Sequence, residues 1–302
     1  MVDERPSGPA AGAARSCAVL LALLLAGHRL VPNVHGLGSL VDSVNPLLGI
    51  AVPVLALAAL LRRSRPALLA VLLPALIWAG PGDAPGCPGR RRGRRHGPVV
   101  SQNLRVSNPD PAATVGALTG DAPDLIGLQE VADGGRVAPV LAERYPHRAA
   151  VSTVALWSRW PIREAHGVDT GLGWDRAAGR RRRARGDLTV YVVHLGSARA
   201  GHTATRDQTV AALADAVRAD PADRLVVLGD LNTATTDRVF DPLTRLLGDA
   251  QAEAGQGFGF TWPAELPVTR PDHVLYRGLT PTTAGVLRTP DSIPPRGDRR
   301  RW

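Results

Sequence analysis

Apolar residues are concentrated in the first eighty positions of the chain. Three apolar stretches lie there, at residues 17–31, 46–61 and 67–79, and the second extends back towards Leu40 with Asp42 as its single charge. A bilayer span needs roughly 20 apolar residues, so the first and third stretches are short. A cleaved signal peptide would explain only the first stretch. We therefore expect about three transmembrane helices, with a buried helical hairpin of a soluble domain as the alternative.

After residue 98 the pattern changes to short β-type runs that alternate with helical segments. Helices are predicted at residues 109–118, 135–144 and 203–218, the first with Asn108 as N-cap and Pro109 at its first position. The β-type runs are at residues 99–106, 124–131, 150–157, 188–195, 224–231, 272–276 and 284–287. Alternation of this kind predicts a layered α/β domain.

The segment between the two regions is rich in Gly, Pro and Arg, which is typical of a linker. The pattern thus divides the chain into a membrane-anchoring region at residues 1–80, a linker at 81–98 and an α/β domain at 99–302.

Positive charge is abundant but not evenly spread. All 36 Lys and Arg residues are Arg, a usage typical of a GC-rich gene, so the pI is weak evidence for nucleic-acid binding. Much of the excess lies in runs at residues 62–65, 90–95 and 180–185, which we expect to be solvated loops rather than a polyanion-binding patch. Cys17 and Cys87 have neither metal-site spacing nor a disulfide framework.

The charge next to the apolar stretches predicts an orientation. Arg5, Arg15 and the run at 62–65 fall on one side of the membrane, as the positive-inside rule requires, whereas the run at 90–95 falls on the other. Because charge near the first helices often dominates, we expect a multi-pass protein of the cell membrane. Its N-terminus would be cytoplasmic and its α/β domain extracytoplasmic.

Polar residues interrupt or end the predicted strands of the α/β domain. They are Asn103, Glu130, His194, Asp230, Asn232, Asp272 and His273. Each alone has a structural explanation, such as a solvated glutamate or a hydrogen-bonded core histidine. Their joint placement indicates a site, because layered α/β folds bind ligands at strand ends.

Asp230 and Asn232 form the most suggestive pair. On an extended segment, residues two apart point to the same face. One side chain can polarise a water while the other donates to a phosphate oxygen. This pairing suits hydrolysis of a phosphoester.

The ordered elements Asn-Leu, Leu-Gln-Glu, His-Leu, Gly-Asp-Leu-Asn and Arg-x-Asp-His resemble the endonuclease/exonuclease/phosphatase (DNase I-like) superfamily. That group includes nucleases, inositol polyphosphate phosphatases and sphingomyelinases. The likeness covers residues 99–287 and includes the segment Trp-Ser-Arg-Trp-Pro-Ile at 157–162. Gly-Asp-Leu-Asn after an apolar strand is its most specific element. The apolar N-terminal region is similar to that of membrane-anchored bacterial members.

The resemblance implies a four-layer sandwich of two mixed sheets flanked by helices. It makes Glu130 the principal ligand of Mg²⁺ or Mn²⁺, with Asn103 beside it. Asp230 would orient or deprotonate the attacking water, Asn232 would hold a phosphate oxygen, and His194 would stabilise charge or assist the leaving group. Asp272 would orient an active-site histidine.

The C-terminal end departs from the family pattern. Members carry Ser-Asp-His before the last core strand, whereas residues 292–302 read Ser-Ile-Pro-Pro-Arg-Gly-Asp-Arg-Arg-Arg-Trp. Asp298 matches the Asp position, but Arg299 stands where His is expected, and no final strand is predicted after it. His273 is a poor substitute because it faces away from Asp272 on a strand. We therefore expect weakened activity.

Three functions are compatible with these features. The leading one is a membrane-anchored, metal-dependent phosphoesterase that hydrolyses a phosphodiester or pyrophosphate, with a lipid-linked substrate favoured by the anchor. The others are a surface nuclease, whose affinity would fall steeply with salt, and a non-catalytic membrane-anchored binding protein. Substituting Glu130 with Gln separates the enzymes from the binding protein.

Overall fold

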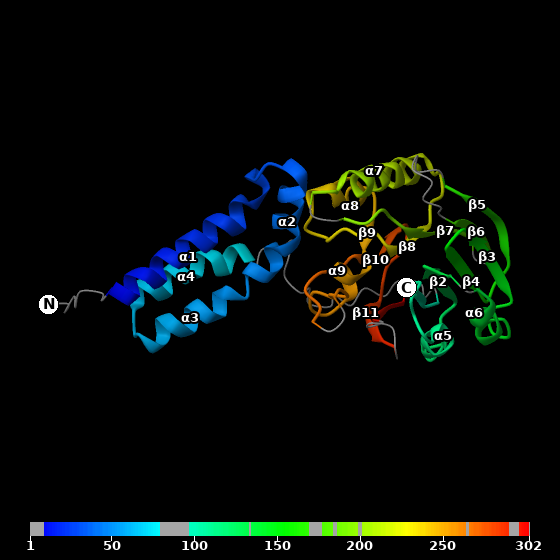
Figure 1. Cartoon of the computed structure of the whole chain (residues 1–302), viewed down its shortest axis with the longest axis horizontal. Coiled ribbons are helices and arrows are strands. Elements are labelled where there is room, and N and C mark those ends of the chain that lie inside the picture. The colour runs from blue at the N-terminus through cyan, green and yellow to red at the C-terminus, as the bar shows by residue number, and fades with distance from the viewer. Residues whose placement is uncertain are drawn as a thin grey trace. The chain divides into compact units, whose positions relative to one another are not determined.

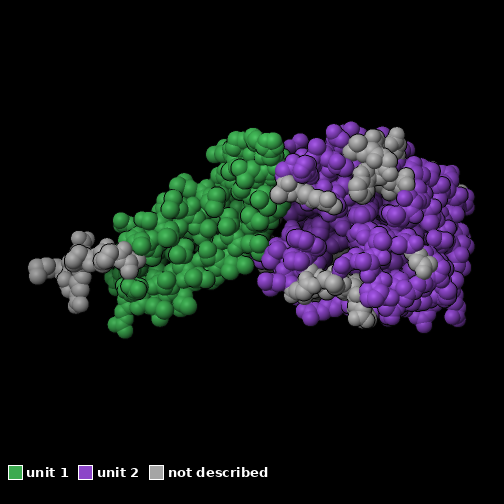
Figure 2. Space-filling model, viewed as in Figure 1, with its two compact units in different colours: residues 1–84, 236–238 green, residues 85–235, 239–302 purple. Residues whose placement is uncertain are grey.

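The computed structural model describes residues 9–78, 97–132, 134–168, 177–183, 186–198, 201–263, 266–289 and 296–301. The chain divides into two compact units, residues 1–84 with 236–238 and residues 85–235 with 239–302 (Figure 2). Arg5, Cys87, the arginine run at 90–95 and most of the predicted linker lie outside the described residues.

The first unit is helical (Figure 1). It comprises α1 (Pro9–Gly27), α2 (Leu37–Leu48), α3 (Ala51–Leu61) and α4 (Arg65–Trp78), with 3-10 turns at His28–Leu30 and Val34–Gly36. A small apolar core of Ala18, Leu21, Leu25, Val52 and Val71 joins α1, α3 and α4.

The second predicted apolar stretch, residues 46–61, is divided between two helices. Val34–Leu48 and Ala51–Leu61 meet at an angle of 44°. The break follows from Pro53, whose ring would clash with the carbonyl of Gly49 in a continuous helix; that carbonyl instead accepts from Val52 N at 2.9 Å. Among the described helices, Gly12–Leu30 alone is long and apolar enough to cross a bilayer by itself.

The one charge in the second apolar stretch, Asp42, is fully buried within the helical unit. Its carboxylate accepts hydrogen bonds from Arg238 Nε at 2.6 Å and Nη2 at 3.0 Å, and lies 2.7 Å from His28 Nδ1. A buried carboxylate is tolerated because it is paired and hydrogen-bonded.

The second unit is built on two mixed six-stranded sheets. The first has the order β11-β12-β1-β2-β4-β3, with β1 and β2 parallel. Its strands are β1 (Val99–Asn103), β2 (Leu125–Gln129), β3 (His147–Val151), β4 (Val154–Ser158), β11 (Thr283–Arg288) and β12 (Arg296–Arg301). The second has the order β5-β6-β7-β8-β10-β9, with β7 and β8 parallel. Its strands are β5 (Ile162–Gly167), β6 (Ala177–Arg183), β7 (Gly186–His194), β8 (Leu225–Asp230), β9 (Gly248–Asp249) and β10 (Asp272–Arg277).

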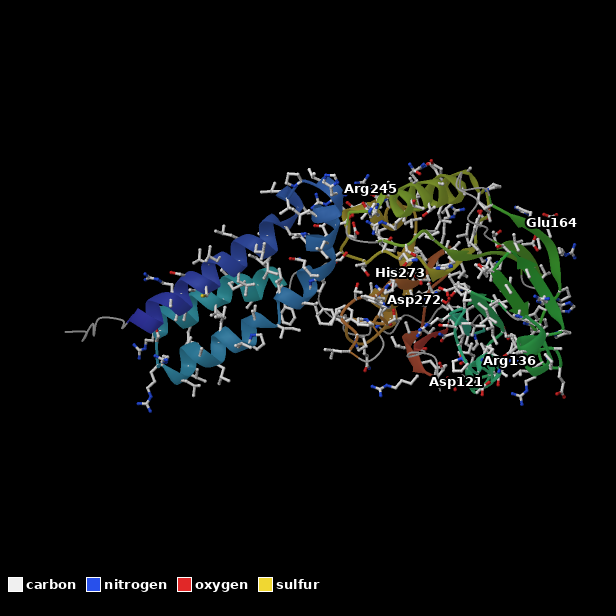
Figure 3. All side chains as sticks on the ribbon, in the orientation of Figure 1. Asp121, Arg136, Glu164, Arg245, Asp272 and His273 are labelled. Atoms are coloured by element: carbon white, nitrogen blue, oxygen red, sulfur yellow. The ribbon has the colours of Figure 1, made fainter. Side chains whose placement is uncertain are left out.

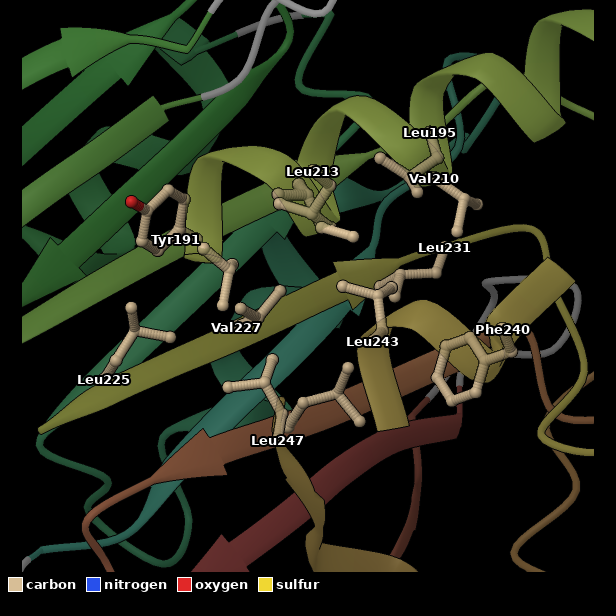
Figure 4. Close-up of a cluster of buried hydrophobic side chains, with 14 residues drawn as sticks. Tyr191, Leu195, Val210, Leu213, Leu225, Val227, Leu231, Phe240, Leu243 and Leu247 are labelled. Atoms are coloured by element: carbon tan, nitrogen blue, oxygen red, sulfur yellow. The ribbon is translucent and has the colours of Figure 1, made fainter. Parts of the chain in front are cut away.

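Three buried clusters hold the layers together. The inner cluster joins the two sheets through residues such as Leu125, Leu156, Val192 and Leu228. On the outer face of the first sheet pack α5 (Pro111–Leu118) and α6 (Gly134–Leu141). The outer face of the second sheet is covered by α7 (Ala204–Ala219), the 3-10 turn Arg238–Phe240 and α8 (Asp241–Thr244) (Figure 4). A short helix, α9 (Ala250–Ala254), follows β9. The predicted α/β sandwich of two mixed sheets flanked by helices is confirmed.

Two predicted elements were wrong in detail. Residues 150–157 are not one strand, because β3 and β4 form a hairpin that turns at Ser152, where φ is +50°. The arginine run at 180–185 is not simply a loop, since its first part belongs to β6, which pairs with both β5 and β7. The local apolar pattern marked neither the turn nor β5 and β6.

The N-cap of α5 is Asp110, not Asn108, and Pro111 rather than Pro109 is at the start of the helix. Asp110 has φ −136° and ψ 74°, and its side chain accepts from Ala113 N at 3.0 Å. The reason is that a residue before proline is disfavoured in the α region, which excludes Asp110 from the helix.

The C-terminal tail contains a strand, contrary to expectation. β12 pairs antiparallel with β11 on one side and with β1 on the other, so it fills an interior position of its sheet. Its arginine-rich sequence hides this pairing, because backbone hydrogen bonds do not depend on side-chain hydrophobicity. Residues 290–295 and the side chains of β12 are outside the description.

Candidate active site

Three of the predicted site residues form a row across neighbouring strands. His194 of β7 is paired in register with Asp230 of β8, and Asp230 is paired with Asp272 of β10. Residues directly opposite each other on adjacent strands project to the same face of a sheet. The second sheet therefore presents an imidazole and two carboxylates side by side; Figure 3 labels Asp272.

The first sheet contributes two more polar side chains. Asn103 ends β1, and Glu130 follows β2 directly. The Asn103 amide nitrogen donates to Glu130 Oε1 at 2.9 Å and to Asp230 Oδ2 at 3.1 Å. One amide thus joins carboxylates from both sheets, and the ends of β1, β2 and β8 converge on a single cluster.

Glu130 is held in an unusual conformation. Its φ is +53°, in the left-handed region that costs an L-residue roughly 1–2 kcal/mol. Val106 N donates to its Oε2 at 3.0 Å, and His194 Nε2 lies 3.7 Å from its Oε1. Backbone strain of this kind is concentrated at functional sites.

The donor set around Glu130 fits a hard cation. Among the described residues, no group of three or more His, Cys, Asp or Glu side chains is arranged to hold a metal ion. Mg²⁺, however, is commonly bound through one or two carboxylates and keeps several waters. Glu130, with Asn103 beside it, offers one such carboxylate. The oxygen of Asn103 accepts from Arg105 N at 2.9 Å, so its nitrogen faces the carboxylates.

Asn232 lies beside Asp230, but not for the expected reason. β8 ends at Asp230, and Asn232 has φ +48°, so the two residues are not on one extended segment. Instead the Asn232 backbone N–H donates to Asp230 Oδ1 at 2.9 Å, which closes a tight turn. The Asn232 side-chain nitrogen donates to Leu195 O at 2.9 Å and keeps a second proton for another acceptor.

Asp272 has a hydroxyl partner in the structure. The Thr261 hydroxyl donates to Asp272 Oδ2 at 2.6 Å. His273, the next residue on β10, is fully buried and its Nε2 lies 2.8 Å from Thr233 O. It therefore takes no part in the row of His194, Asp230 and Asp272, as the alternation of strand side chains predicted.

Two buried arginines near Asn232 and the turn that follows it were missed by sequence reasoning. Arg206 is 2% exposed and its Nη1 donates to Asn232 O at 3.4 Å. Arg270 is 5% exposed and bonds to Asp249 and Thr235. Nothing in the local sequence distinguishes either arginine from a surface residue, although Arg270 lies in the Arg-x-Asp-His element.

Comparison with known proteins supports the fold described above. A family model described as the Endonuclease/Exonuclease/phosphatase family matches residues 100–295. No curated protein is significantly similar to the chain in sequence. The fold is similar to sphingomyelinase C from Streptomyces griseocarneus, at 17% identity and TM-score 0.54, covering 69% of this chain and 99% of that one.

Two further solved structures share the fold. Beta toxin from Staphylococcus aureus has 15% identity and TM-score 0.56, covering 68% of this chain and 99% of the toxin. TDP2 from D. rerio, complexed with a single-strand DNA product, has 15% identity and TM-score 0.57, covering 68% of this chain and 97% of TDP2. Identities this low establish a common fold and nothing finer.

Proposed function

Because this chain belongs to the Endonuclease/Exonuclease/phosphatase family, we propose that it is a membrane-anchored, metal-dependent phosphoesterase. The observation that carries the proposal is the cluster in which Asn103 joins Glu130 to Asp230, with His194 beside Glu130. Amide, carboxylate and imidazole groups from both sheets meet there. Their chemistry suits the hydrolysis of a phosphodiester or pyrophosphate.

Each side chain has a part in this proposal. Asp230 accepts a proton from the attacking water or orients it, since its carboxylate is an acceptor at the end of β8. Asn232 donates its remaining amide proton to a phosphate oxygen. His194 stabilises charge on the phosphate or assists the leaving group. Asp272 supports the same face from β10.

Glu130 would hold Mg²⁺ or Mn²⁺, with Asn103 beside it. Such an ion neutralises negative charge on a phosphoryl group when it is bound. Asn103 has its own role here, because its two donated hydrogen bonds keep Glu130 and Asp230 at fixed positions.

Membrane anchoring by residues 1–80 is supported by the exposed side chains of the helical unit. Large apolar residues on three helices are more than half exposed: Leu20, Leu23, Leu57, Leu60, Leu61, Leu69, Leu72, Leu73 and Leu76. Extended apolar surface of this kind marks contact with a membrane or a partner. We propose three crossings of the bilayer, by α1, by the bent pair α2–α3 and by α4, an odd number that puts the two ends of this region on opposite sides. At 14 residues, α4 is about 21 Å long, and a helix shorter than the hydrocarbon core is accommodated by local thinning of the bilayer.

We further propose that the N-terminus is cytoplasmic and that the α/β unit, with the linker before it, is extracytoplasmic. A C-terminal alkaline phosphatase fusion tests this, since that reporter is active only outside the cytoplasm. High activity of the fusion is expected, and an inactive but stably expressed fusion would reverse the orientation.

The catalytic proposal is tested with the full chain in detergent micelles and bis-p-nitrophenyl phosphate. With Mg²⁺ present we expect hydrolysis, and Glu130→Gln is expected to lower kcat by about 10²-fold or more, the size typical of lost electrostatic stabilisation. Glu143→Gln is the matched control, because Glu143 is an exposed residue just after α6, which packs on the outer face of the first sheet. Equal rates for wild type and Glu130→Gln would refute the proposal and favour a binding protein.

A lipid-linked substrate is proposed over nucleic acid because the anchor raises the local concentration of lipid-borne phosphoesters. A nuclease would lose affinity steeply between 50 and 200 mM salt. Rates that are insensitive to salt in this range support the lipid substrate.

A further inference from the structure

The turn that follows β8 carries Asn232 and is bonded to buried side chains on two sides. Asn232 and the residues after it leave the sheet through a left-handed conformation, with φ +48° at Asn232. Leu231 N donates to Pro271 O at 2.9 Å, so the turn begins against the segment just before β10. The hydroxyl of Thr233 donates to Leu231 O at 2.8 Å.

His273 holds the first part of this turn. Its Nε2 lies 2.8 Å from the carbonyl oxygen of Thr233, and its side chain is fully buried. A carbonyl only accepts hydrogen bonds, so Nε2 carries the proton. The other ring nitrogen, Nδ1, faces Asp249 Oδ2 at 3.4 Å.

Arg270 holds the second part. Its Nη2 donates to the Thr235 hydroxyl at 2.8 Å and to Asp249 Oδ2 at 2.9 Å, while its Nη1 donates to Asp249 Oδ1 at 3.0 Å. A bidentate pair of this geometry fixes the guanidinium plane. The Arg270 guanidinium therefore faces Thr235 in the turn.

Asp249 is the anchor of this arrangement. It is buried, and its Oδ1 also accepts from Gln251 N at 2.8 Å and Ala252 N at 3.2 Å at the start of α9. Four donors from two segments therefore fix the carboxylate. Arg270, which is bonded to Asp249, is therefore held in place relative to β9 and α9.

We propose that Arg270 and His273, anchored by Asp249, are positioning residues that set the turn carrying Asn232. This inference rests on the proposed function of Asn232 and Asp230 in phosphoester hydrolysis. Neither Arg270 nor His273 reaches a substrate, because both side chains are buried. They act on the reaction through the backbone of residues 232–235.

A purely structural role predicts a different outcome from a positioning role. If the cluster only stabilises the unit, its variants lose thermal stability, and kcat falls only as far as the folded fraction falls. If it positions Asn232, kcat falls while KM and the folded fraction are kept, since small displacements of a reacting group cost up to about 10²-fold in rate.

The mildest test removes one acceptor and leaves every charge in place. Thr235→Val deletes the hydroxyl that Arg270 contacts but preserves the bidentate pair with Asp249. Thr119→Val is the matched control, because the Thr119 hydroxyl bonds locally to Gly116 O at 2.8 Å on α5. We expect Thr235→Val to lower kcat between about 10- and 100-fold with KM unchanged, and the control to match wild type.

A second pair of variants tests His273. In His273→Gln the amide nitrogen can replace Nε2 as donor to Thr233 O, whereas His273→Leu supplies no donor. We expect the Gln variant to keep most of the wild-type kcat and the Leu variant to lose it. Equal kcat in the two variants, at equal melting temperature, would overturn the proposal.

Amide hydrogen exchange in the full chain provides a readout that does not need activity. Thr235→Val and His273→Leu should speed exchange in a peptide covering residues 231–236 and leave a peptide from α7 unchanged. Unchanged exchange at 231–236 would overturn the positioning role. If wild type hydrolyses nothing but exchange changes as expected, the proposed function fails while the structural link to the turn stands.

A double variant tests whether Thr235 acts through Asn232. In an Asn232→Ala background, Thr235→Val should have no further effect on kcat, since the group it positions is gone. An unreduced effect in that background would refute the proposal.

Discussion

At the scale of residues, Asn103 occupies the central position of the site, because its one amide nitrogen donates to carboxylates from both sheets. Its orientation is fixed from the other end by the Arg105 backbone N–H, which donates to the amide oxygen. Two carboxylates from different sheets therefore share one hydrogen-bond donor.

The buried pair of His273 and Asp249 makes stability depend on pH. Burial lowers the pKa of His273 below its ordinary 6.5, and Arg270 lowers it further against the opposing hydrogen bonds to Asp249 and Thr233. As pH falls below 6.5 the unfolded chain takes up this proton first, so the stability of the unit falls through that window. Burial would raise the pKa of Asp249, but Arg270 and His273 hold it well below 3.8, and its contribution is lost only under more acidic conditions.

Thermal unfolding of the full chain between pH 7.5 and 5.5 measures the loss of stability that we attribute to His273. We expect the melting temperature of wild type to fall with pH and that of His273→Gln to fall less. Parallel curves for the two proteins would contradict this assignment.

Site residues could be predicted where the neighbouring sequence carried a signal, and not where their contacts are long-range. Asn103, Glu130, His194 and Asp230 end apolar strands, which marked them in the sequence, and the structure places them together. The roles proposed for them remain predictions. Arg270 and its partner Thr235 are 35 residues apart, and such a long-range bond leaves no local pattern.

At the scale of elements, Gly127 of β2 lies where side chains of the second sheet, Val192 and Leu228, pack against the first sheet. A methyl group there would overlap Leu228 of β8, which is fully buried in the inner cluster. Gly127→Ala should lower the free energy of unfolding by about 1–3 kcal/mol, the usual cost of overpacking a core. Chemical denaturation followed by tryptophan fluorescence measures the change.

Gly285→Ala is the control for that substitution. Gly285 lies in β11, and a methyl group there would meet nothing within 4 Å. Its unfolding free energy should stay at or slightly above that of wild type, because alanine is the better strand residue. Similar losses in both variants would mean that strand propensity rather than sheet packing is responsible.

Elements were predictable where apolar residues alternate or cluster. The strands around Leu125, Val192 and Leu228 follow from such runs, and α7 follows from helical spacing. β12 was missed because an arginine-rich strand gives no hydrophobic signal. Its place is set by backbone pairing with β1 and β11.

At the scale of the whole molecule, the proposed anchor would restrict the proposed phosphoesterase to a surface. If substrate and enzyme share one bilayer, the rate should depend on the mole fraction of the substrate lipid and not on its bulk concentration. In proteoliposomes of the full chain, we expect the hydrolysis rate to fall in proportion to the mole fraction of substrate lipid when that lipid is diluted with inert lipid. A rate that follows bulk concentration alone would indicate a soluble substrate.

The bond between Asn103 and Asp230 joins positions 127 residues apart in the chain. Local helices form within about a microsecond, whereas contacts between distant segments form late in folding. We therefore expect the cluster of Asn103, Glu130 and Asp230 to be completed later than the local helices of a refolding chain. On the proposed function, a nascent or partly folded molecule would be silent towards phosphoesters, and recovered turnover would be a stringent measure of complete folding.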